Sequence, residues 1–149
     1  MGEEAIYSFL LMHYAESFSF IKGSLYEYVN RAGSQSDTKA DDPWGDVAVD
    51  LKEKVLQMGL YEQYANTINA FIATAAIVSL DKMAGKYKWR GYRFKAKNRV
   101  RRYKRERDSN YPVDINHMNA KAKVLYPFIK VGLIMPIYFV SCVNRMRRK

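Results

Sequence analysis

The sequence predicts an all-α protein, folded as a single helical domain over residues 1–149. Three observations lead to this class. Apolar residues recur at helical spacing in several segments, whereas no segment alternates with the two-residue period of a strand. Two apolar runs approach the length of a transmembrane helix, and a strongly basic segment joins them. We therefore expect an N-terminal apolar helix, an amphipathic helix and one or two helices of near-transmembrane length.

The N-terminal third of the chain is predicted to contain one helix and one linker. Residues 1–32 form the apolar helix, because large apolar side chains dominate them and charged ones are few. Residues 33–42 follow as a polar linker, because Gly, Ser, Asp and Thr are concentrated there.

Residues 43–85 are predicted to form a pair of helices. Asp42 and Pro43 favour a helix start, with the Asp as N-cap and the Pro in the first turn. Gly59 favours the end of the first helix. This helix is expected to be amphipathic, because five apolar residues share one helical stripe: Trp44, Val47, Leu51, Val55 and Met58.

The second helix of this pair contains a candidate membrane segment, residues 63–80. It carries no charge over 18 residues, and as a helix it would be ~27 Å long, enough to cross a thin bilayer. The alternative is the buried helix of a soluble bundle, which needs the same small residues for close packing. Under either reading, a helix-packing face is predicted at Ala65, Asn69, Ala70, Ala73 and Thr74.

Residues 86–112 form the basic segment, and 12 of the 22 residues from Lys86 to Arg107 are Lys or Arg. Such a helix repels itself, so it needs an anionic counter-surface to be ordered. We predict contact with anionic lipid or an acidic partner by Lys86, Lys88, Arg90, Arg93, Lys95, Lys97, Arg99, Arg101, Arg102, Lys104 and Arg105. Interleaved aromatic residues are predicted to lie at a membrane interface: Tyr87, Trp89, Tyr92 and Phe94.

Residues 113–149 are predicted to form an apolar C-terminal helix, with a second candidate membrane segment at residues 124–143. This run holds a single charge, Lys130, and two prolines that would kink a helix, Pro127 and Pro136. If both candidate segments spanned a membrane, the basic segment and the basic C-terminus would lie on opposite sides, against the positive-inside rule. A topology with one spanning segment avoids this conflict.

The sequence contains no recognisable catalytic set, so we predict a protein that is not an enzyme and holds no metal or cofactor. Two carboxylate–histidine pairs have helical or turn spacing, His13 with Glu16 and Asp114 with His117. A di-iron bundle would need further glutamates in a different order. Cys142, the only cysteine, lies in an apolar run, where it acts as a small hydrophobic residue.

Charge is divided sharply between the two halves of the chain. Residues 1–85 carry 6 Lys or Arg and 12 Asp or Glu, a net charge of −6, whereas residues 86–149 carry 19 and 3, a net charge of +16. Such polarity is typical of a protein placed between two environments.

The sequence therefore favours a non-catalytic accessory or structural subunit of a larger membrane complex, of the organellar respiratory or ATP-synthase type. The expected setting is the mitochondrial inner membrane. Its partners would be the other subunits and anionic lipid, with a cardiolipin-like phospholipid as the only bound molecule suggested. The alternative is a basic organellar ribosomal or RNA-binding protein, since basic and aromatic residues together suit phosphate contacts and base stacking. A third reading is a solvated helix that docks on an acidic protein.

Overall fold

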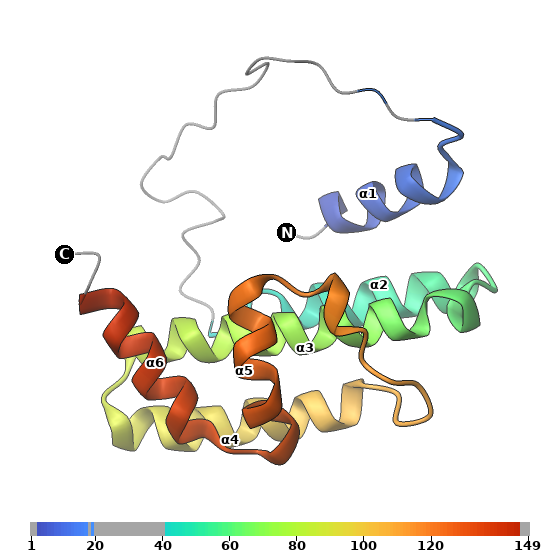
Figure 1. The fold of residues 1–149 in the computed structure, drawn as a ribbon. Helices are drawn as coiled ribbons and strands as arrows, with labels where there is room; N and C mark the ends of the chain where they lie inside the picture. The colour runs from blue at the N-terminus through green and yellow to red at the C-terminus, as the bar shows by residue number, and fades with distance from the viewer. Residues whose placement is uncertain (1–2, 18, 20–40, 147–149) are drawn as a thin grey trace.

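The computed structural model describes residues 3–17, 19 and 41–146. These residues form helices and turns without any strand, which confirms the all-α class. Five helices gather into a bundle, and α1 lies against one side of it (Figure 1). The helices are α1 (Glu3–Tyr14), α2 (Gly45–Gln57), α3 (Tyr61–Lys86), α4 (Trp89–Glu106), α5 (Ala120–Val131) and α6 (Ile134–Met146), with a short 3-10 helix η2 (Ile115–His117).

Helix α3 is the centre of the bundle, and α2, α4, α5 and α6 pack around it (Figure 1). Of its 26 residues, 14 are buried, and one side, with Phe71, Thr74 and Val78, is partly open. A helix that is apolar all round must be covered, either by other helices or by lipid. Here other helices of the same chain cover most of it, and its alanines let them approach closely.

Helix α3 contains the first candidate membrane segment. Among the described helices it alone is long and apolar enough to cross a membrane, and 67% of its most apolar 18-residue window is buried inside the bundle. Length and composition do not distinguish such a helix from the core helix of a bundle, because both meet the same criterion.

The predicted end of the first helix of the pair is confirmed at Gly59, which has φ +72°. The Gly59 N–H donates to Leu56 O, and the Leu60 N–H donates to Val55 O at 3.1 Å. This pattern is a Schellman motif, in which a left-handed glycine lets the chain fold back over the last turn. The glycine thereby sets the antiparallel packing of α2 on α3.

The prediction of one continuous C-terminal helix is wrong, because α5 ends at Val131 and α6 begins at Ile134. Gly132 has φ +82°, and the Leu133 N–H donates to Phe128 O at 2.8 Å, which forms a second Schellman motif. Pro136 lies in the first turn of α6, where its missing N–H leaves no helical bond unmade. The second candidate membrane segment is therefore two short helices joined by a sharp turn.

The N-terminal predictions are tested in part. Helix α1 ends at Tyr14, where the prediction placed an apolar helix over residues 1–32. The His13 Nδ1 lies 2.9 Å from the Tyr64 hydroxyl, and the ring of Phe9 meets that of Tyr64 edge-on, so α1 rests on the start of α3. Most of the remaining predicted helix and of the linker 33–42 lies outside the described residues.

Candidate anion-binding surface on helix α4

Helix α4 carries most of the basic segment, and its inner face packs on α3, α5 and α6. Five residues of that face are buried, at helical spacing: Tyr92, Ala96, Arg99, Val100 and Tyr103. Four of them are apolar or aromatic, so the helix is amphipathic despite its charge. The buried Arg99 is the exception, because it carries a charge and therefore needs partners inside the protein.

Arg99 is held inside the protein by two carboxylates. Its side chain is only 2% exposed, with Nε 2.8 Å from Asp42 Oδ2 and Nη1 donating to Glu106 Oε2 at 3.2 Å. The Nε hydrogen is not directed at Asp42, so that contact is an ion pair without an aligned hydrogen bond, and Nη2 has no partner. A buried guanidinium is tolerated only with such counter-charges, because removing it from water is costly.

Asp42 is the residue around which these contacts are organised. Its second oxygen accepts a hydrogen bond from the buried Ser79 hydroxyl at 2.5 Å, and Arg102 also approaches it. The prediction that Asp42 caps the following helix is wrong, because Trp44 occupies the N-cap position without any side-chain cap. Asp42 contacts α3 and α4 instead, and its carboxylate lies so close to Gly45 that a Cβ there would clash.

Arg102 extends the ion-pair network toward the solvent. Its guanidinium contacts Asp46 at 2.6 Å and Asp42 at 3.3 Å, and it also pairs with Glu106 one turn further along α4. The acidic residues before and within α2 therefore form the counter-surface for this side of α4.

Asp41 completes the counter-surface at the junction of α3 and α4. Lys86 and Lys95 approach its two oxygens at 2.8 and 2.7 Å, and the Tyr87 hydroxyl donates to it at 2.8 Å. Partial burial raises the pKa of Asp41, but the hydrogen bonds from Lys86, Lys95 and Tyr87 outweigh it and lower that pKa to about 2.

Four of the eleven predicted contact residues, Lys86, Lys95, Arg99 and Arg102, thus have carboxylate partners within the chain. The other seven are exposed, and the described residues offer them no ion pair. They are Lys88 before the helix and the outer basic face of α4, which we define as Arg90, Arg93, Lys97, Arg101, Lys104 and Arg105.

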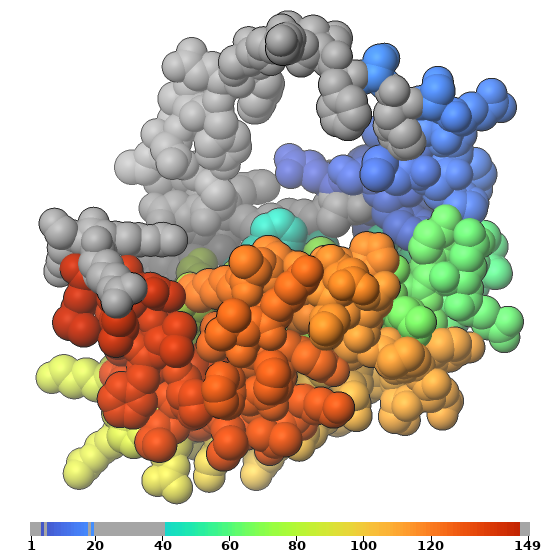
Figure 2. All heavy atoms as spheres, viewed as in Figure 1, coloured from blue at the N-terminus to red at the C-terminus, as the bar shows by residue number. Residues whose placement is uncertain are grey.

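The outer basic face is continuous along α4. Each member lies three or four residues from another member, and a shallow hollow of about 550 Å³ is lined by Asn98, Arg101, Lys104 and Arg105. None of the described residues that line it is acidic. Long side chains at the start of α4 project beyond the lower edge of the molecule in Figure 2, drawn in yellow.

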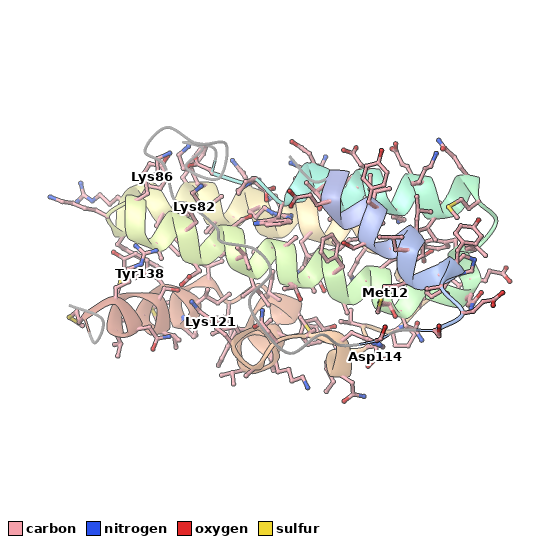
Figure 3. All side chains as sticks on the ribbon, turned by 90° about the horizontal axis from the view of Figure 1, so that it is seen from above. Met12, Lys82, Lys86, Asp114, Lys121 and Tyr138 are labelled. Carbon is pink, nitrogen blue, oxygen red and sulfur yellow. The ribbon has the colours of Figure 1, made fainter. Side chains whose placement is uncertain are left out.

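The predicted interfacial aromatic residues also divide into those that pack within the chain and one that is exposed. Tyr92 is fully buried, and its hydroxyl donates to Ile134 O at 3.2 Å. Trp89 is half-buried, 5.3 Å from the ring of Tyr138, which lies between α6 and the α3–α4 pair (Figure 3). Tyr87 contacts Asp41, and only Phe94 lies openly on the surface, 71% exposed and beside the outer basic face.

The predicted helix-packing residues of α3 contact the chain itself. Ala65, Asn69, Ala70 and Ala73 are buried, and Thr74 is half-buried.

The Asn69 side chain holds the loop that follows α4. Its Nδ2 donates to Asp108 O at 2.8 Å and to Tyr111 O at 2.9 Å, and its Oδ1 accepts from the Asp108 N–H. Tyr61 donates to the Asp108 carboxylate, and burial together with that carboxylate raises the pKa of Tyr61 to about 12. These contacts fix where α4 ends relative to α3.

The two histidines lie apart from this surface. His117 Nδ1 is 2.9 Å from Asp114 Oδ2 on the exposed η2 turn (Asp114 is labelled in Figure 3), and His13 contacts Tyr64. A backbone hydrogen bond from Asn116 and the nearby His117 together lower the pKa of Asp114, against the opposing effect of burial. Within the described part of the chain, no three His, Cys, Asp or Glu side chains gather closely enough to hold a metal ion.

Sequence reasoning identified the basic segment but not its internal partners. Asp42, Ser79 and Glu106 were missed, although the acidic cluster at residues 41–46 was a visible signal. Comparisons with known protein families, with curated proteins and with solved structures find no match to this chain.

Proposed function

We propose that this chain is a non-catalytic accessory subunit of a larger membrane protein complex, attached in part through the outer basic face of α4. The proposed setting is an organellar assembly of the respiratory or ATP-synthase type in the mitochondrial inner membrane. Its partners would be the neighbouring subunits and anionic lipid, including a cardiolipin-like phospholipid.

The observation that carries this proposal is the division of charge on α4. Four acidic residues lie on one side of the helix, where they pair with Lys86, Lys95, Arg99 and Arg102: Asp41, Asp42, Asp46 and Glu106. The six cations of the outer basic face stay exposed at repulsive three- and four-residue spacings. An anionic surface would relieve that repulsion, and each cation near anionic headgroups contributes ~1 kcal/mol.

The proposal is tested by native electrophoresis of membranes solubilised in a mild detergent. The tagged chain is expected to migrate in a high-mass band that stains for respiratory-chain or ATP-hydrolysis activity. The variant Arg93→Gln/Lys97→Gln/Arg101→Gln should lower the share of the chain in that band. The matched control Arg93→Lys/Lys97→Arg/Arg101→Lys keeps the charge and should behave like the wild type. Migration of the wild type at its own mass would overturn the proposal.

A second candidate function, RNA binding, is favoured by the exposed ring of Phe94 beside cations of the outer basic face. Such an aromatic can stack on an unpaired base while the cations contact phosphates. Filter binding to polyuridine RNA tests it. Tight binding that weakens steeply with salt, and weakens further in Phe94→Ala, would favour this function. Equal, weak binding by the wild type and Phe94→Ala would exclude it.

A further inference from the structure

The α5–α6 hairpin has an exposed apolar face, which is distinct from the outer basic face of α4. On α6 a stripe at helical spacing consists of Met135, Phe139, Val143 and Met146, which are 54%, 59%, 41% and 70% exposed. Leu133 in the turn and Val131 and Val124 on α5 extend it, at 54%, 64% and 64%. We call these seven residues the hairpin apolar face; exposed apolar side chains gathered on one hairpin in this way mark an interaction site.

The opposite side of the hairpin holds it firmly on the bundle. Leu125 and Ile129 of α5 and Ile137 of α6 are fully buried against the other helices. Figure 2 shows α5 and α6 together forming much of one face of the molecule, drawn in orange to red. The hairpin is therefore amphipathic, with one side in the core and the other facing outward.

The charged side chains of the α5–α6 hairpin itself are all positive. Residues 115–149 contain no Asp or Glu, while Lys123 and Lys130 are exposed on α5. Lys104 of the outer basic face reaches the hairpin turn, since a Cβ on Gly132 would lie 3.7 Å from its Nζ. Lys121 pairs with the Asp81 carboxylate, and Arg145 donates to the Asp81 backbone oxygen. Lys104, Lys123 and Lys130 are exposed, and the described residues offer them no ion pair, so these cations can face a ligand.

We infer that the hairpin apolar face docks onto the surface of an anionic lipid bilayer, lying in the interface and not spanning it. An apolar helical face bordered by lysines matches the headgroup and acyl boundary, where the apolar residues enter and the cations meet lipid phosphates. The half-buried pair Trp89 and Tyr138, at the junction of α4 and α6, would lie at the edge of this contact.

The lengths of the two helices decide between lying on a membrane and crossing it. Helix α5 has 12 residues and α6 has 13, so neither exceeds ~20 Å. A bilayer core is ~30 Å thick, and a spanning helix needs ~20 residues. This inference deepens the proposed function, since it rests on the membrane setting and names the surface and its lipid partner.

The test is flotation of the purified full chain with two kinds of vesicle, pure phosphatidylcholine and phosphatidylcholine with cardiolipin. We expect flotation with the cardiolipin vesicles and much weaker flotation with phosphatidylcholine alone. The variant Phe139→Ser/Val143→Ser should bind about tenfold less tightly or worse, because it removes two apolar side chains from the interface. Circular dichroism should show an unchanged fold, since both residues are exposed.

The matched control is Leu56→Ser, which changes an apolar residue that is 49% exposed on α2, outside the hairpin. It should float like the wild type. Equal flotation of wild type and Phe139→Ser/Val143→Ser, or equal binding to both vesicle types, would overturn the inference. Failure to float while the chain still migrates in the high-mass native band would overturn it as well, leave the proposed function standing and assign the face to a protein partner. Flotation of a chain that is absent from the high-mass band would support the inference and overturn the proposed function.

Discussion

Both sides of helix α4 carry arginine, but the arginines on the two sides have opposite surroundings. Arg99 is buried between Asp42 and Glu106, whereas Arg101, two positions later, is exposed on the outer basic face. Arg99 makes ion pairs that hold helices together, whereas Arg101 makes no ion pair or side-chain hydrogen bond with the described residues. A cation's identity in the sequence therefore says little about its role until its neighbours in space are known.

The largest loss of stability is expected from removing the ion pair on the inner side of α4. Asp42→Asn keeps an acceptor for Ser79 but removes the charge beside the buried Arg99, so the free energy of unfolding should fall by about 3 kcal/mol. Urea denaturation followed by circular dichroism measures it. Asp50→Asn, which changes an exposed carboxylate on α2, should stay within about 0.5 kcal/mol of the wild type. Equal, small effects of both variants would mean that the inner side is no more structural than the outer side.

A double-mutant cycle sharpens the same contrast. Arg99→Met removes the buried charge, so Asp42→Asn should cost less in that background than in the wild type. We expect a coupling free energy of about 1–3 kcal/mol between the two positions. The parallel cycle with Arg101→Met should give a coupling near zero, because Arg101 has no ion pair with Asp42. Additive effects in both cycles would contradict the pairing of Arg99 with Asp42.

Removing cations from the outer basic face should raise the free energy of unfolding, whereas changes on the inner side lower it. Lys97→Gln/Arg101→Gln removes repulsion between cations four residues apart, so the free energy of unfolding should rise by about 0.5 kcal/mol at low ionic strength. Near 1 M salt the difference should vanish, because the Debye length falls to about 3 Å. Thermal unfolding at two salt concentrations measures it. A loss of stability would show instead that these cations make structural contacts.

The pH-dependent effect concerns Asp41, whose partners Lys86 and Lys95 are 42% and 41% exposed. Its pKa falls from 3.8 to about 2 on folding. Its ion pairs therefore stabilise the fold above pH 3.8, and the stabilisation is lost as the pH falls toward 2. Asp41→Asn should cost about 1 kcal/mol or less at pH 7, and its difference from the wild type should shrink between pH 4 and pH 2. A difference that did not change with pH would rule out this role.

The predictable part of the site was its local chemistry. The density of Lys and Arg showed that α4 needs an anionic counter-surface, and an acidic first half was visible in the same chain. Which cations would meet which carboxylates depends on the packing of α2 and α4 on α3, and residues far apart in the sequence supply both sides. Ser79 and Asn69 read as interruptions of an apolar run, yet each makes a hydrogen bond that connects α3 to another segment.

The sequence by itself determined the helical class, the end of α2 at Gly59 and the concentration of positive charge in the second half. These are local properties, since they follow from side-chain period, from the freedom of glycine at positive φ and from composition. Only the tertiary structure decided that α3 is surrounded by its own chain and that the C-terminal run folds back at Gly132 to leave an apolar face outward. It also decided that Arg99 belongs to the core and Arg101 to the surface. Burial and charge pairing depend on which elements meet in space, and in a helix two positions along the chain are enough to turn a side chain from one environment to the other.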